Sequence, residues 1–115
     1  MLKKCFQYSI YLVDFPEIGG SVQQGLRPAI CCSNDASNIF SEIGQFLPLT
    51  TQEKCNLPTH YTLFVKDYPF LKHDSIVMGE QISTLPQDKV ISFLGRLKKE
   101  DLNGIKGIIC EQFSL

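Results

Sequence analysis

Turn-forming residues divide this chain of 115 residues into short apolar segments. Pro, Gly, Asn and Asp recur so often between the segments that they favour short strands over long helices. The strands are expected over 10–15, 28–32, 43–49, 60–65, 75–78 and 81–85, with a kink at Gly79 between the last two. Several short strands at such spacing are typical of a small β-barrel.

The end of the chain has a different period. Apolar residues recur there at spacings of three and four, namely Leu102, Ile105, Ile109 and Phe113. This stripe predicts a C-terminal helix. Gly104 and Gly107 each weaken such a helix by about 1 kcal/mol relative to alanine, so packing against the barrel must stabilise it. Segment 89–97 fits a strand or a helix, and its β-branched and aromatic residues favour a strand.

Length and charge indicate one ordinary globular domain over residues 1–115 with a single modest core. The formal net charge of −1 argues against a passive nucleic-acid coat, although a narrow groove with a few donors stays possible. No apolar run approaches the roughly 20 residues that cross a bilayer, and the first residues do not resemble a signal peptide. We therefore expect a cytoplasmic protein without a membrane partner.

The five cysteines are an odd number, and no pair has Cys-x-x-Cys spacing. Neither a disulfide framework nor a zinc site is indicated, and we expect no metal or other cofactor. Cys31, Cys32 and Cys110 lie in apolar runs. We expect them to be small core residues of a reduced protein.

One loop contains a candidate site. Gly20 and Gly25 bracket it, and Arg27, one of two arginines in the chain, follows just before Pro28. The glycines permit sharp turns, and the proline restricts the backbone of the arginine. A guanidinium held at such a loop–strand junction suits bidentate contact with a phosphate. A solvated arginine on a surface hairpin is the alternative.

Five segments occur together in a recognisable order: 20–28 (GSVQQGLRP), 33–35 (SND), 48–51 (PLTT), 57–60 (LPTH) and 80–84 (EQIST). On these segments the chain resembles the MazF/PemK-type toxins over roughly residues 8–113. The resemblance implies a mainly β fold, a small SH3-like barrel with a C-terminal helix, and a homodimer. It also implies the toxin of a type II toxin–antitoxin pair, acting as a ribosome-independent endoribonuclease.

The resemblance assigns catalysis to Arg27 and Thr50. It implies RNA-binding roles for Ser21, Gln23, Gln24, Thr51 and Gln81. The implied reaction is metal-independent attack of a ribose 2′-hydroxyl on the adjacent phosphorus, which yields a 2′,3′-cyclic phosphate and a 5′-hydroxyl end. Arg27 would neutralise charge in the transition state, and the hydroxyl of Thr50 would position a non-bridging oxygen.

The general base is the open question, because Val22 stands where many relatives have glutamate. Ser83 stands where arginine is frequent, so the resemblance also implies the loss of one cationic contact. Glu80 is the first candidate for the base and His60 the second. Two alternatives stay open: Glu80 could pair with Arg27 only to orient it, and His60 could be structural.

The implied partners are single-stranded RNA, a second copy of the chain, and a cognate MazE-like antitoxin whose segment occupies the RNA groove. Operator DNA would be bound only through the antitoxin. A second hypothesis starts from Val22 and Ser83: the same barrel also serves a toxin that poisons DNA gyrase, so the chain could be a protein-binding module without nuclease activity.

Overall fold

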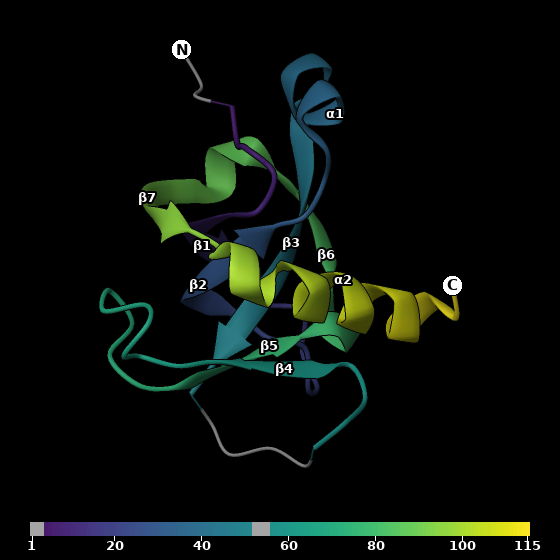
Figure 1. The fold of residues 1–115 in the computed structure, drawn as a ribbon. Helices are drawn as coiled ribbons and strands as arrows, with labels where there is room; N and C mark the ends of the chain where they lie inside the picture. The colour runs from purple at the N-terminus through teal and green to yellow at the C-terminus, as the bar shows by residue number, and fades with distance from the viewer. Residues whose placement is uncertain (1–3, 52–55) are drawn as a thin grey trace.

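The computed structural model describes residues 4–51 and 56–115. These residues form seven strands and two α-helices (Figure 1). The strands are β1 (Ser9–Phe15), β2 (Gly25–Cys31), β3 (Ile43–Thr50), β4 (His60–Leu63), β5 (Ser75–Met78), β6 (Ser83–Pro86) and β7 (Val90–Arg96). The helices are α1 (Asp35–Phe40) and α2 (Lys99–Phe113), and two 3-10 turns are η1 (Gly79–Gln81) and η2 (Gln87–Lys89).

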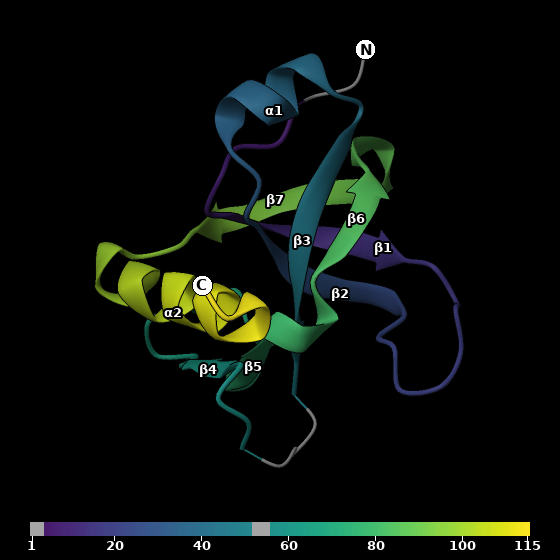
Figure 2. The ribbon, with the colours of Figure 1, turned by 90° about the vertical axis from the view of Figure 1, so that its right-hand side faces the viewer.

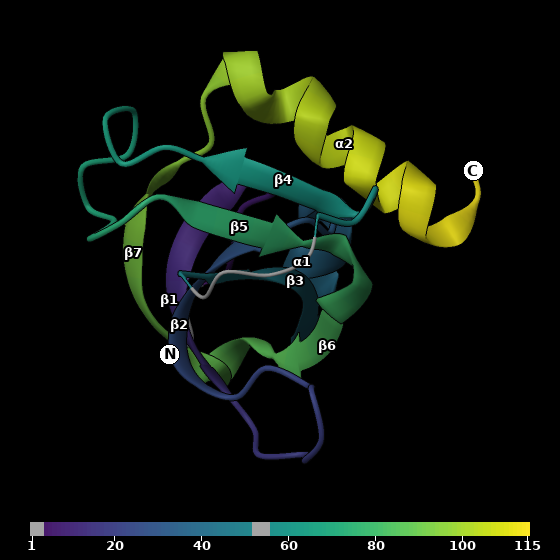
Figure 3. The same cartoon turned by 90° about the horizontal axis from the view of Figure 1, so that it is seen from below.

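The strands pair antiparallel in the order β4-β5-β3-β2-β1-β7, and β6 adds to β3. β3 is the central strand, because its first half pairs with β6 and its end pairs with β5, while β2 occupies its other edge. The sheet curls around a core into an open barrel, as the view along it shows (Figure 3). The predicted mainly β fold, a small barrel with a C-terminal helix, is thus confirmed.

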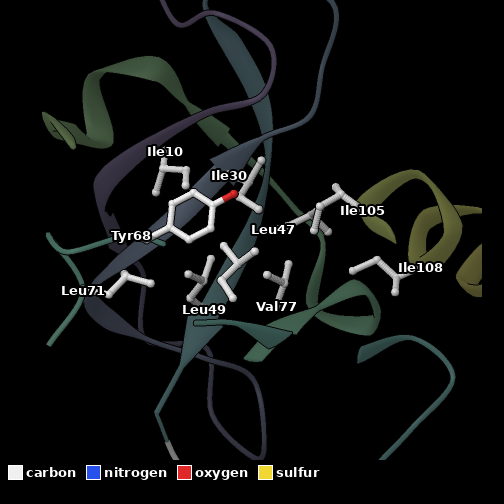
Figure 4. Close-up of a cluster of buried hydrophobic side chains, with 10 residues drawn as sticks. Ile10, Ile30, Leu47, Leu49, Tyr68, Leu71, Val77, Ile105 and Ile108 are labelled. Atoms are coloured by element: carbon white, nitrogen blue, oxygen red, sulfur yellow. The ribbon is translucent and has the colours of Figure 1, made fainter. Parts of the chain in front are cut away.

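The central strands are buried on both faces. Ile10 of β1 and Ile30 of β2 belong to the main core inside the barrel (Figure 4), whereas Tyr11 and Cys31 belong to a second cluster. Neighbouring residues of a strand point to opposite faces, so both faces of β1 and β2 are covered. This explains why 28–32 is an almost continuous apolar run rather than an alternating one.

Helix α2 packs against β4 and η1 (Figure 2). Its buried residues are Ile105 and Ile108. The expected stripe was therefore only partly right: Ile109 is half-buried and Phe113 is 52% exposed. The last turn of α2 extends past the barrel (Figures 1 and 3).

Two tyrosine hydroxyls donate hydrogen bonds to Asp101 in the first turn of this helix. Tyr61 donates to Oδ1 of Asp101 at 2.7 Å, and Tyr68 donates to Oδ2 at 2.5 Å. A Cβ on Gly104 would overlap the ring of Tyr61. Gly104 therefore allows the helix to approach β4 closely, which offsets its low helix propensity.

Several local expectations need correction. The segment between the strands expected at 28–32 and 43–49 contains α1, and the side chain of Asn34 caps this helix by accepting from the Ser37 N–H. The strand expected at 81–85 begins at Ser83, because η1 occupies 79–81. Cys110 is exposed on α2 rather than buried, whereas Cys31 is buried and Cys32 partly so. Segment 89–97 contains strand β7, as favoured.

Neither described helix is long and apolar enough to span a membrane. Part of the segment between β3 and β4, including Cys55, lies outside the described residues.

Candidate active site

The loop between β1 and β2 turns at its glycines. Gly20 has φ +61° and Gly25 has φ +81°, in the left-handed region that other residues adopt at a cost. Gly25 also opens β2, where it pairs with Phe15. Arg27 is consequently inside the strand, opposite Val13, rather than at the loop–strand junction that the sequence suggested.

The guanidinium of Arg27 joins the loop to the sheet. Its Nε and Nη2 donate to the carbonyl oxygen of Gln24 at 3.2 and 2.9 Å. Its Nη1 donates to the carbonyl oxygen of Leu49 in β3 at 3.3 Å. Partial burial lowers the pKa of Arg27 below its ordinary value, but an arginine remains cationic in a protein. A fixed positive charge therefore lies between the loop and the end of β3.

Thr50 closes β3 next to this charge. The register of β2 with β3 pairs Ala29 with Pro48. Continued by two residues, the same register places Arg27 opposite Thr50. Thr50 is only 4% exposed, whereas Thr51 is exposed. The hydrogen bond from Arg27 to the Leu49 carbonyl places the guanidinium beside the residue that precedes Thr50.

A second polar group surrounds Glu80. Its Oε1 accepts from the hydroxyl of Thr59 at 2.9 Å, and its Oε2 lies 2.8 Å from Nε2 of His60. The β4–β5 register explains the proximity, because His60 pairs with Met78 immediately before η1. The His60 side chain is 5% exposed and that of Glu80 is 28% exposed.

The second ring nitrogen of His60 indicates the tautomer. Nδ1 accepts a long hydrogen bond, 3.5 Å, from the backbone N–H of Leu57. In the neutral ring the proton is then on Nε2, which donates to Glu80. Burial raises the pKa of Glu80, but hydrogen bonds from His60, its own backbone and Thr59 outweigh burial and bring that pKa below its ordinary value. Glu80 is thus held as a carboxylate.

Gln81 connects this group to the loop. Its Oε1 accepts from the Gln23 N–H at 3.3 Å, and its Nε2 donates to the Ser21 carbonyl at 3.1 Å. Arg27 also donates to the Gln24 carbonyl. The side chains of Gln81 and Arg27 therefore bind the backbone of three loop residues, Ser21, Gln23 and Gln24. Most of the sequence-predicted RNA-binding residues are therefore gathered around one loop.

The candidate residues form two groups at one rim. Among the described residues, no hydrogen bond or ion pair joins Glu80 to Arg27; the carboxylate pairs with His60. Thr59 was not among the predicted site residues, although it directly precedes His60 in the segment 57–60. The hydrogen bond between the two candidate bases, His60 and Glu80, was not predicted either.

Val22 and Ser83 are positions at which the chain departs from the family pattern. Val22 is on the loop and 37% exposed. The hydroxyl of Ser83 donates to the Gln81 carbonyl at 2.9 Å, within its own chain segment. No group of three or more His, Cys, Asp or Glu side chains in the described part of the chain is arranged to hold a metal ion.

The sequence is similar to those of known toxins and endoribonucleases. Residues 6–113 match the family described as PemK-like, MazF-like toxin of type II toxin-antitoxin system. The chain is 32% identical over 97 residues to Endoribonuclease EndoA of Bacillus subtilis, covering 84% of this chain and 83% of the relative. It is 31% identical over 98 residues to Endoribonuclease MazF of Staphylococcus saprophyticus, covering 82% of this chain and 81% of that protein.

Solved structures share the fold. The crystal structure of MazF (Form-I) from Deinococcus radiodurans has a TM-score of 0.82 at 20% identity and covers 98% of this chain and 99% of its own. An endoribonuclease in complex with its cognate antitoxin, from Mycobacterial species, has a TM-score of 0.76 at 22% identity, with 96% of each chain covered.

Proposed function

The chain belongs to the PemK-like, MazF-like toxins of type II toxin–antitoxin systems, and on that premise we propose how it cuts RNA. It is an endoribonuclease of this family, since relatives more than 30% identical over four fifths of the chain are named endoribonucleases. The proposed substrate is single-stranded RNA, including mRNA, cut at specific sequences without the ribosome. A ribose 2′-hydroxyl attacks the adjacent phosphorus, leaving a 2′,3′-cyclic phosphate and a 5′-hydroxyl.

The observation that supports this proposal is that hydrogen bonds hold the guanidinium of Arg27 in one orientation. Arginine has five N–H donors, and the described contacts to Gln24 and Leu49 use three nitrogens of the group. N–H donors on Nη1 and Nη2 remain for a phosphate oxygen. Because the group is already oriented, it stabilises charge on phosphorus without reorganising during the reaction. Thr50, opposite it in the extended register, positions a non-bridging oxygen.

We assign the base to Glu80 and a positioning role to His60. Glu80 is ionised and can accept the 2′ proton. Nδ1 of His60 faces the Leu57 N–H, so this nitrogen is not directed at substrate. His60 and Thr59 instead hold the two carboxylate oxygens in place. No metal takes part in the proposed mechanism.

The loop is the proposed RNA contact. Gln24 and Thr51 are exposed there or beside it, Ser21 is exposed at its tip, and Gln23 is half-buried. The amide of Gln81 is already bonded to the loop backbone. We therefore expect Gln81 to shape the RNA-binding surface as well as to contact it.

The proposed assembly is a homodimer with RNA in a groove shared by the two subunits, inhibited by a MazE-like antitoxin segment in that groove. Antitoxin complexes among the structural neighbours support this proposal. Operator DNA would be bound only through the antitoxin. We place the enzyme in the cytoplasm, where its mRNA substrate is.

The test is cleavage of a long mixed-sequence RNA by the purified protein in EDTA, beside the Arg27→Ala variant. Specific cuts by the wild type and none by the variant support the proposal. Inhibition of gyrase supercoiling by folded protein that leaves RNA intact would support the protein-binding alternative and contradict the nuclease.

A further inference from the structure

Helix α1 leaves one aromatic side chain almost completely in solvent. Phe40, the last residue of α1, is 89% exposed, and the nearby Ile39 and Ile43 are exposed as well. An apolar patch of this kind, unlike a single scattered residue, indicates an interaction surface. Figures 1 and 2 show α1 at the opposite end of the molecule from β4 and from the loop between β1 and β2. The patch is therefore separate from the candidate active site.

A cavity of about 810 Å³ has walls that are equally apolar. They include Phe6, Ile91 and Phe93, and each of these side chains is more than half exposed. The last two belong to β7, which pairs only with β1 among the described strands. No neighbouring strand of the same chain therefore covers the outer edge of this wall.

Hydrogen bonds hold the cavity next to α1. Gln87 lines the cavity, and its Nε2 donates to the carbonyl oxygens of Asn38 and Ser41 at 2.8 and 2.9 Å. Lys4, another lining residue, donates from Nζ to the Ser41 carbonyl at 2.9 Å. The exposed aromatic side chain of α1 and the cavity are therefore neighbours on one face of the molecule.

The charges beside these two features are opposite in sign. Glu42 is exposed two residues after Phe40. The charged residues that line the cavity are two cations, Lys4 and Arg96, and one anion, Asp88. Within the described residues, Lys4 binds the carbonyl of Ser41, whereas no hydrogen bond or ion pair engages the exposed side chain of Arg96. An acidic group that accompanies an aromatic ring into this cavity is therefore favoured.

We propose that this face binds a second copy of the chain, with Phe40 of each copy inserted into the cavity of the other. A two-fold axis permits the exchange, because the aromatic side chain and the cavity lie on the same face and the patch is self-complementary. The cavity is as large as pockets that hold drug-sized ligands, so a phenylalanine ring fits in it. Each Glu42 then approaches Arg96 of the other copy, and the RNA-binding ends of both copies stay free.

Sedimentation equilibrium of the full chain over a range of concentrations tests this contact. We expect the wild type to form a larger species as its concentration rises. Phe40→Ser should weaken that association by about tenfold or more, as the loss of a buried aromatic anchor usually does. Phe64→Ser is the matched control, because Phe64 is 47% exposed but follows β4 at the other end of the molecule. It should associate like the wild type.

A charge exchange tests the orientation of the two copies. Glu42→Arg and Arg96→Glu should each weaken the association, and the double variant should recover it because the two charges are then opposite again. Circular dichroism checks that every variant is folded. Phe40→Ser should cut RNA at the wild-type rate per subunit, since Phe40 is remote from Arg27.

The proposal is overturned if the mass of the wild type does not depend on concentration and is the same in Phe40→Ser. A double charge variant that associates no better than the single variants would also overturn it. If the wild type does not self-associate and Phe40→Ser weakens antitoxin binding instead, the face belongs to the antitoxin and the proposal is wrong. The sedimentation results do not depend on whether the protein cuts RNA.

Discussion

The guanidinium of Arg27 donates twice to a single acceptor, the carbonyl oxygen of Gln24. That fork holds the end of the loop against β2, while a third bond reaches Leu49 in β3. The side chain proposed to neutralise the phosphate is therefore also the one that fixes the loop beside it. Substitutions of Arg27 can separate these two roles. Lysine keeps the positive charge but not the two parallel hydrogen bonds to Gln24, and alanine keeps neither.

Arg27→Ala should lower the cleavage rate by a factor of about 10² to 10³ or more, the usual effect of removing one donor to a transition-state oxyanion. Arg27→Lys keeps the charge but cannot form the planar fork, so we expect it to restore only part of the activity. Single-turnover cleavage rates measure both effects, with thermal unfolding as the check on folding. Full activity of Arg27→Ala would remove this residue from the mechanism.

Gln81→Ala should loosen the loop, because both bonds from its amide to Ser21 and Gln23 are lost. Endoproteinase Glu-C cuts after glutamate, and Glu17 is the exposed glutamate of this loop. We expect faster cutting at Glu17 in the variant and slower cutting in both proteins once antitoxin is bound. Equal rates in wild type and variant would show that Gln81 does not hold the loop.

Glu80→Gln should reduce the cleavage rate strongly and leave RNA binding intact, because the amide keeps the shape and loses the base. His60→Gln is the matched variant, since its amide N–H can still donate to Glu80. We expect it to lose much less activity than Glu80→Gln. If His60→Gln is as inactive as Glu80→Gln while binding RNA normally, His60 rather than Glu80 transfers the proton.

The lowered pKa of Glu80 also affects stability. The ordinary pKa is 4.5, and the folded value lies below it. A carboxyl with a lowered folded pKa stabilises the fold above its unfolded pKa, and this contribution is lost as pH falls through the folded value. Glu80→Gln should therefore be less stable than wild type at pH 7, and the difference should shrink in acid. A difference in unfolding free energy that is independent of pH would contradict a stabilising role for the Glu80 carboxylate.

The strands could be predicted from the sequence because turn residues separate them and their apolar content is high. Helix α1 could not, because its six residues are too few to establish a helical period. Arg27 was expected just outside its strand, since Gly25 looked like a loop residue; pairing with Phe15 extends β2 to include it.

Some features of the candidate site could likewise be predicted from the sequence and others could not. The loop residues and Arg27 could be found because they are close in sequence. The contact between His60 and Glu80 could not, because it depends on the register of β4 with β5.

Two helix glycines provide a matched test of packing. Gly107→Ala should raise stability by about 1 kcal/mol, because a Cβ there meets open space and alanine favours the helix. Gly104→Ala should lower it by about 1–3 kcal/mol, because its Cβ would displace the ring of Tyr61 from Asp101. Chemical denaturation measures both variants. A stabilising Gly104→Ala would show that α2 does not depend on this close approach.

The most direct test of the central claim uses two RNA oligonucleotides that contain a mapped cleavage site and differ by one oxygen. One is all ribose, and the other has a 2′-deoxyribose at the nucleotide 5′ to the cut. In EDTA, the all-ribose RNA should be cut to a 2′,3′-cyclic phosphate and a 5′-hydroxyl, and the deoxy-substituted RNA should bind with similar affinity but stay intact. Cleavage of the deoxy-substituted RNA at the same position would contradict 2′-hydroxyl attack at the Arg27 site.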